Sequence, residues 1–198
     1  TSTSTMSFTL PQLLETLRAA TTADTSLLHA SNEQLDAWEV KQEYWTGLLD
    51  ITFDRSVSDV NIRRLAIIRF KNGVTRYWRD RIVNRVKVAI QPKTKEVIRT
   101  RLLDVIYEPD RVSARQVAVA IARIARLDYP SAWPTLVSSL HEAIVYAARA
   151  MSSPDARLVL IRAAETLVQV LKEFESVRVE TESVVEGDGA SRRGSSAL

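Results

Sequence analysis

The stretch "RLDYPSAWPTL", residues Arg126–Leu136, decides the fold of this chain. It follows an alanine-rich apolar run, "VAVAIARIA", that is typical of a helix, and a second apolar pattern with helical spacing follows it directly. Because a proline biases the residue before it away from helical backbone angles, Tyr129 is a natural end of the first helix. We expect Pro130 to open the next helix and Asp128 to accept backbone N–H groups at its start. Trp133 is large enough to fill the wedge between neighbouring helices.

Helical patterns continue on both sides of this stretch. We expect about nine helices joined by short links, each with an apolar stripe at intervals of three or four residues. The stripes are Leu13, Leu14 and Leu17; Leu28, Leu35 and Trp38; Trp45, Leu48, Leu49 and Ile51; Ile62, Leu65, Ala66, Ile68 and Phe70; Val74, Trp78, Ile82 and Val86; Ile98, Leu102, Val105 and Ile106; the run at 117–125; Trp133, Val137, Leu140, Ile144 and Ala147; and Leu158, Ile161, Val168 and Leu171.

Residues suited to helix ends mark the boundaries of these helices. Gly73 suits the left-handed position after a helix, so it predicts a break between the fourth and fifth helices. No segment alternates convincingly with a period of two, so we expect no strand. The expected starts are Thr9 with Pro11 in the first turn, Thr25, Ser58 or Asp59, Pro92 and Ser113.

Two of the predicted helices resemble each other. "IRRLAII" at 62–68 is similar to "ARQVAVA" at 114–120, and an offset of 52 residues matches Arg63 with Arg115 and Ala66 with Ala118. A repeated helical unit with a small residue at a fixed place favours an all-α solenoid over a globular bundle. We expect about four helical pairs over residues 9–175, a flexible N-terminus over 1–8 and a disordered tail over 176–198. An exposed apolar end is expected where a further pair would stack.

Composition argues against several classes of protein. The chain has no cysteine, which excludes disulfides, thiol catalysis and thiolate metal sites and fits a cytosolic or nuclear protein. The first residues show no signal-peptide pattern, and no apolar run approaches the roughly 20 residues of a membrane span. We therefore expect no membrane insertion.

Patterns for catalysis are missing as well. His29 and His141 are the two histidines, and no ligand spacing links them, so we expect no metal and no cofactor. No phosphate-binding glycine loop or nucleophile motif occurs. Glu39 and Glu43 lie four residues apart on one helix, which is typical of a solvated face. We expect a protein that is not an enzyme.

Positive charge is concentrated in the middle of the chain. The net charge is +3, but Asp54–Arg101 holds 14 Lys and Arg against 4 Asp and Glu. This imbalance favours a polyanionic or acidic partner. Against nucleic acid, Trp78 falls in an apolar stripe rather than among the charges, and no sequence-reading motif occurs. A solvated outer face is the other interpretation of the basic run.

Three blocks of the sequence resemble one family. "DYPSAWPTL" fills the D-x-P-x-x-W-P-x-L signature of the N-terminal domain of importin-β-like karyopherins, which are nuclear transport receptors. "VNIRRLAIIRFKNGVTRYW" is similar to an earlier helix of that domain, and "SNEQLDAWEVKQEYWTGLLDI" to its first repeat. The segment "GVTRYW" most resembles the importin eleven branch. The matching signature residues are Asp128, Pro130, Trp133, Pro134 and Leu136, then Lys71, Asn72 and Trp78, then Glu33, Leu35, Trp38, Glu39, Tyr44, Leu48 and Leu49.

The resemblance spans about Leu10–Phe174 and implies HEAT-like helical pairs. It also implies binding of the small GTPase Ran in its GTP form, through polar residues on the second helices of the first pairs. The candidate Ran-binding residues are Lys71, Asn72, Arg115 and Gln116. Family members are several times longer, so the chain resembles a fragment, and cargo and nucleoporins would bind through the further repeats. The resemblance implies a protein that shuttles between nucleus and cytoplasm through the nuclear pore.

Other interpretations of these residues remain open. Lys71 is equally typical of a solvated charge near a helix end, and Asn72 of a C-cap. Arg115 could instead bind a neighbouring helix. The alternative function is a helical scaffold that binds nucleic acid or an acidic protein through the basic face at 54–101.

Overall fold

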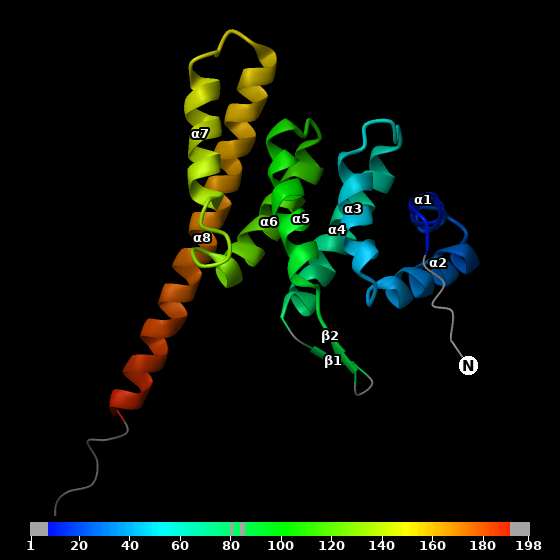
Figure 1. Cartoon of the computed structure of the whole chain (residues 1–198), viewed down its shortest axis with the longest axis horizontal. Coiled ribbons are helices and arrows are strands. Elements are labelled where there is room, and N and C mark those ends of the chain that lie inside the picture. Colours follow the sequence, from blue (N-terminus) through cyan, green and yellow to red (C-terminus); the bar gives the residue numbers. More distant parts are fainter. Residues whose placement is uncertain (1–7, 80, 84–85, 191–198) are drawn as a thin grey trace, which may run out of the picture.

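The computed structural model describes residues 8–79, 81–83 and 86–190, and helical pairs follow one another along the chain (Figure 1). Two short strands connect the second pair to the third. The elements are α1 (Leu10–Ala19), α2 (Thr25–Trp38), α3 (Gln42–Phe53), α4 (Val60–Trp78), β1 (Arg81–Val83), β2 (Val86–Val88), α5 (Pro92–Leu102), the 3₁₀-helix η1 (Leu103–Tyr107), α6 (Arg111–Asp128), α7 (Leu136–Ala148) and α8 (Pro154–Ala190).

The helices stack as a solenoid. The second helices of successive pairs, α4, α6 and α8, pack side by side, and α3 packs against α5 in the other layer. In the last pair, α7 lies along α8, whose far end projects away from the stack (Figure 1). The prediction of an all-α solenoid with about four helical pairs is confirmed.

Helix starts follow the expected chemistry, with two shifts of position. Thr9 caps α1 in a capping box with Gln12, and Asp59 caps α4. The predicted caps Thr25 and Ser113 are wrong, because the carboxylates of Asp24 and Asp110 accept the first N–H groups of α2 and α6 instead. An aspartate at this position adds a favourable charge to the cap hydrogen bond.

Gly73 does not end a helix, so the predicted break is wrong. Helix α4 runs on through Gly73 to Trp78, and no described glycine has a positive φ. A Cβ atom at position 73 would lie 2.6 Å from Cη2 of Trp45, which is buried in α3. The glycine therefore lets α3 and α4 approach closely, which is a packing role rather than a turn.

The predicted fifth helix is also wrong, because its second half forms a hairpin. Strands β1 and β2 pair antiparallel, with Arg81 opposite Val88, and project below the helices between α4 and α5 (Figure 1). Ile82 has 76% of its surface exposed, so it is not part of the apolar stripe predicted for the fifth helix. β-Branched residues dominate both strands, and this preference outweighs the four-residue spacing that suggested a helix.

The structure describes residues on both sides of the domain boundaries predicted at 9 and 175. Helix α8 continues past residue 175 to Ala190, whereas the sequence analysis placed the start of a disordered tail at 176. Residues 176–186 contain no Gly or Pro to stop a helix. At the other end, Phe8 stacks on Trp38 with ring centroids 4.5 Å apart. The remainder of the predicted flexible N-terminus, 1–7, and residues 191–198 lie outside the described residues.

The core runs without a break through the stacked pairs. Its largest buried side chains include Trp45, Trp78, Tyr44 and Phe70. On α6 half of the buried residues are alanine, which allows α4 and α8 to pack closely on either side. The N-caps Asp59 and Asp110 are 51 residues apart, one fewer than the offset of 52 between the two similar sequence blocks.

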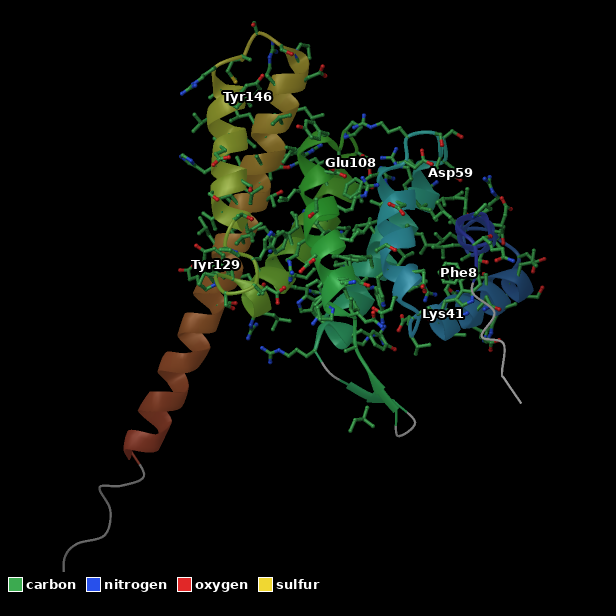
Figure 2. All side chains as sticks on the ribbon, viewed as in Figure 1. Phe8, Lys41, Asp59, Glu108, Tyr129 and Tyr146 are labelled. Carbon is green, nitrogen blue, oxygen red and sulfur yellow. The ribbon has the colours of Figure 1, made fainter. Side chains whose placement is uncertain are left out.

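The last pair leaves apolar side chains uncovered. Ile161, Val168 and Leu171 on α8 each expose about half of their surface, and Tyr146 on α7 exposes 77%. Tyr146 points outward from the upper part of α7 (Figure 2). The predicted apolar end of the solenoid is therefore present.

Among the described residues, no helix combines the length and the apolar character that crossing a membrane requires.

Candidate protein-binding surface

The second-helix face, formed by α4, α6 and α8, carries the residues that the sequence analysis proposed for binding. Lys71 and Asn72 lie in the last two turns of α4, where Lys71 is half-buried and Asn72 is exposed. Arg123 of α6 donates to the backbone carbonyl of Lys71 at 3.2 Å. The side chains of Lys71 and Asn72 have no hydrogen-bond or ion-pair partner among the described residues.

Arg115 and Gln116 lie near the start of α6, with Arg115 exposed and Gln116 half-buried. Since Lys71 lies beside Arg123, eight residues after Arg115, the two candidate pairs are about 12 Å apart along the helices. The structure thus places all four residues on neighbouring helices, but as two separate sites. The match of Arg115 with Arg63 is wrong, because Arg63 is buried at 8% exposure and Arg115 faces solvent.

The signature residue Asp128 has a different role from the predicted one. Its carboxylate accepts the indole N–H of Trp78 at 2.9 Å and an N–H of Arg99 at 2.7 Å. It therefore does not cap the next helix, although its backbone carbonyl accepts N–H groups of Ala132 and Trp133. Asp128 joins the ends of α4 and α6 to α5, and this fixes the geometry of the second-helix face.

The rest of the signature shapes the link from α6 to α7. Tyr129 has extended backbone angles, as its position before a proline predicts. Pro130 does not open a helix, because α7 begins only at Leu136, after a series of turns that includes Pro134. Trp133 is buried at 4% exposure, as expected. Tyr129 stacks on Phe174 of α8, at the junction of the last two pairs (Figure 2).

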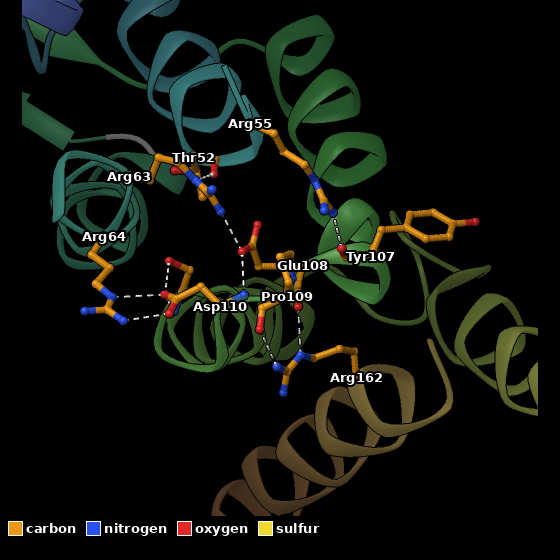
Figure 3. Close-up of polar contacts among 10 residues, drawn as sticks. Thr52, Arg55, Arg63, Arg64, Tyr107, Glu108, Pro109, Asp110 and Arg162 are labelled. Carbon is orange, nitrogen blue, oxygen red and sulfur yellow. Dashed lines mark hydrogen bonds and ion pairs between the residues drawn. The ribbon is translucent and has the colours of Figure 1, made fainter. Parts of the chain in front are cut away.

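The link between η1 and α6 is the polar centre of the stack (Figure 3). Glu108, with 1% of its surface exposed, accepts from Arg63 of α4 at 2.6 Å and from the backbone N–H of Asp110. From the other side, Arg162 of α8 donates to the backbone carbonyls of Glu108 and Pro109. Three consecutive second helices are therefore held in register by one buried carboxylate and its neighbours.

Asp110 adds a second ion pair to this link. Arg64 donates to both of its carboxylate oxygens, at 3.0 and 2.6 Å, while one oxygen also caps α6 at Ser113 (Figure 3). The hydrogen bonds from Arg64, followed by those from Ser113, hold the pKa of Asp110 well below its usual value. This arrangement is structural, because its polar atoms already have partners within the chain.

No chemistry for a metal or cofactor emerges from the part of the chain that the structure describes. It contains no group of three or more His, Cys, Asp or Glu residues placed to hold a metal ion. His141 is exposed on α7, and His29 pairs with Glu33 on the surface of α2.

Sequence reasoning missed two cations on this face. Arg111 and Lys172 are exposed, and they line a groove between α6 and α8 together with Arg115. The spacing of Arg111 and Arg115, four residues apart, was visible in the sequence and places both on one side of α6. No local pattern could have placed Lys172 in the same groove, because its position there depends on how α8 packs against α6.

Comparison with known proteins supports the resemblance. Residues 31–108 match the family model of the importin-beta N-terminal domain. The sequence is 39% identical to Importin-11 of Mus musculus over 132 residues, which are 67% of this chain and 13% of that protein. It is 43% identical to importin beta-like protein KAP120 of Saccharomyces cerevisiae over 110 residues, which are 56% of this chain and 10% of that protein.

The fold has a match among solved structures. The exportin Cse1 in its cargo-free, cytoplasmic state matches 91% of this chain with a TM-score of 0.68 and 20% identity, over 19% of the Cse1 chain. At that identity the match concerns the fold alone. Together with the family model, it confirms the resemblance inferred from the three sequence blocks. Residues 31–108 of this chain therefore resemble the importin-beta N-terminal domain, and they form part of a solenoid of stacked helical pairs.

Proposed function

We propose that this chain is the N-terminal module of a nuclear transport receptor and binds the small GTPase Ran in its GTP form. The observation that carries the proposal is the match of residues 31–108 to the importin-beta N-terminal domain. The relatives that match are named as importins and, for Exportin-2 of Drosophila melanogaster at 24% identity, as an exportin. A protein with this role would shuttle between nucleus and cytoplasm.

The second-helix face supplies polar groups suited to such a partner. Lys71 offers a point charge, and Asn72 both donates and accepts hydrogen bonds. Arg115 and Gln116 extend the surface onto α6. Because the two pairs lie about 12 Å apart along the helices, a folded partner would contact both pairs, whereas a single small ligand would contact one.

The mechanism that fits this role is linkage between two binding sites, without chemistry in this chain. Ran-GTP and cargo would each change the affinity of the receptor for the other by the same factor. This chain spans 13% of the length of Importin-11. We propose that cargo and nucleoporins bind repeats that these 198 residues do not include.

The test is a calorimetric titration of the chain with Ran loaded with GTP and, separately, with GDP. We expect strong preference for the GTP form. The double variant Lys71→Ala/Asn72→Ala should weaken binding about tenfold or more, equivalent to about 1.4 kcal/mol. Arg115→Ala/Gln116→Ala should weaken it as well, whereas Arg149→Ala, an exposed cation on α7, should not.

Equal binding of both nucleotide forms, or none, would contradict the proposal. The proposal would also be contradicted if Arg149→Ala weakened binding as much as the two double variants. The loss of affinity would then come from the lower net charge rather than from the second-helix face.

The alternative partner, a polyanion bound by the basic segment at 54–101, has less support. Seven of its arginines donate to acceptors within the chain, so the segment does not form one free basic face. The exposed cations that remain include Arg79 and Lys93, beside the hairpin. Binding of a single-stranded DNA 20-mer with a steep loss of affinity in salt would favour this alternative.

A further inference from the structure

A groove of about 490 Å³ runs along the second-helix face between α6 and α8. Its floor contains small and apolar side chains, including Ala114, Ala118 and Val168. Ala114 and Ala118 expose only 2% and 5% of their surface, whereas Val168 exposes 50%. The groove therefore has a small apolar base between its cations.

Three of the four cations that line this groove have no partner among the described residues. Arg111, Arg115 and Lys172 are exposed and make no hydrogen bond or ion pair with another described residue. The fourth cation, Arg162, is held by the carbonyls of the η1–α6 link and by Glu165 at 2.9 Å. Glu165 is the one acidic residue among those that line the groove, and it is already paired. The lining is therefore strongly cationic.

The cations mark both ends of the groove. Arg162 lies beside the start of α6, and Arg126 near the end of α6 pairs with Glu173 of α8 at 3.5 Å, so the two helices run in the same direction. Arg111 consequently lies at one end of the groove and Lys172 at the other. Ten residues of α8 separate Arg162 from Lys172, or about 15 Å, which an extended peptide spans with about five residues.

We propose that this groove binds an extended acidic segment of a partner protein. In an extended peptide, side chains alternate between two sides. Carboxylates on one side would reach Arg111, Arg115 and Lys172, while small apolar side chains on the other would contact the alanine floor. Pairing of unpartnered guanidinium groups with carboxylates gives both geometry and charge complementarity.

An acidic peptide fits this groove better than nucleic acid does. The apolar floor has no aromatic ring among its lining residues on which a base could stack. The carboxylate of Glu165 lies among the cations and would repel a phosphate chain. A peptide can avoid this repulsion, because it can place a neutral residue opposite Glu165.

The inference goes beyond the Ran proposal and does not depend on it. The proposed site for an acidic partner also differs from the basic segment at 54–101, because Arg111, Arg115 and Lys172 all lie outside that segment.

The experiment is fluorescence anisotropy with a fluorescein-labelled peptide that alternates glutamate and alanine. We expect saturable binding to the whole chain. The double variant Arg111→Glu/Lys172→Glu should weaken binding by about tenfold or more, because it places two carboxylates at the ends of the groove. Arg149→Glu, a single charge reversal at the exposed residue just after α7, should change the affinity less than about twofold.

Folding of the variants is checked by circular dichroism and thermal melting. A glutamate in the first turn of α6 is favourable to the helix dipole, so Arg111→Glu should not disturb α6. If the reversal variant fails to fold, Arg111→Gln/Lys172→Gln removes the two charges without adding any, and it should weaken peptide binding in the same direction.

The inference would be overturned if the peptide did not bind the unmodified chain, or if Arg149→Glu weakened binding as much as Arg111→Glu/Lys172→Glu. It would also be overturned if a single-stranded DNA 20-mer bound more tightly than the peptide and this double variant abolished that binding. Since the assay contains no Ran, a chain that binds the peptide but not Ran-GTP supports this inference while contradicting the proposed function.

Discussion

Trp78 at the end of α4 donates its indole N–H to the carboxylate of Asp128 at the end of α6, with 2.9 Å between Nε1 and Oδ1. The two residues belong to two different blocks of the sequence resemblance. The other carboxylate oxygen accepts from Arg99 of α5 at 2.7 Å. One side chain thus connects three helices, which gives the aspartate of the signature a structural explanation.

Replacement of Asp128 by alanine should destabilise the fold strongly. It would leave the buried Trp78 N–H and the largely buried Arg99 guanidinium without their acceptor. Loss of one partner of a buried ion pair costs about 3 kcal/mol or more. Urea unfolding followed by tryptophan fluorescence measures the difference in the free energy of unfolding.

The control for this prediction is Arg101→Ala, which removes two ion pairs between half-exposed partners, Arg101 with Asp50 and Arg101 with Asp104. Exposed pairs contribute about 0–1 kcal/mol, so the loss should be small. If Asp128→Ala costs no more than Arg101→Ala, the connecting role of Asp128 is wrong.

Replacement of Gly73 by alanine should destabilise the α3–α4 contact although alanine favours helix. A new Cβ atom would lie 2.6 Å from the buried ring of Trp45. Overpacking of this kind costs about 1–3 kcal/mol, against about 1 kcal/mol gained in helix propensity. We expect a lower Tm and a changed tryptophan emission spectrum.

Gly47→Ala is the matched control, because Gly47 is also inside a helix. Its added Cβ would lie 3.0 Å from a terminal methyl of Leu13, which is the flexible end of a side chain. Gly47→Ala should therefore lower Tm less than Gly73→Ala does. If Gly47→Ala lowers Tm more than Gly73→Ala does, the close approach to Trp45 is not the reason for the glycine at position 73.

Stability should depend on the ionisation of Asp110. The pKa of its carboxyl is lowered from 3.8 by the Arg64 hydrogen bonds, so the ion pair stabilises the fold above the unfolded-state pKa. The contribution is lost as the pH falls below 3.8 toward the lower folded-state value. Asp110→Asn keeps a cap acceptor but removes the titrating group.

The measurement is the free energy of unfolding of both proteins from pH 7 to acid. The unmodified chain should be the more stable at neutral pH, and its advantage over Asp110→Asn should narrow below about pH 4. A difference that stays constant through that range would mean that the Arg64–Asp110 pair carries no pH-linked stability.

The sequence predicted the helical pairs because apolar spacing is a local property. The sequence could not locate the end of α4. A glycine is compatible both with a helix end and with a close contact between helices, and only the position of Trp45 shows that Gly73 serves the contact. The hairpin at 81–88 was missed for a related reason. Its valines fit either a four-residue helical stripe or a strand, and the strand pairing is what distinguishes them.

The candidate site was predictable only in part. Lys71 and Arg115 follow from the resemblance and do lie on the second-helix face, but their separation along the stack depends on the packing of α6 against α4. The groove between α6 and α8 could not be predicted from the sequence. It joins Arg111 to Lys172, which are 61 residues apart, and this juxtaposition requires the register set by Arg162 and the η1–α6 link.

The uncovered apolar face of α8 should make the isolated chain self-associate. Ile161, Val168 and Leu171 recur at intervals of seven and three residues, so they form one stripe, and each exposes about half of its surface. We expect the sedimentation coefficient to rise with protein concentration. The triple variant Ile161→Gln/Val168→Gln/Leu171→Gln should remain monomeric with unchanged helix content, because these side chains lie outside the core. A monomer at every concentration before substitution would contradict the prediction, and it would mean that the stripe is too narrow to hold two copies together.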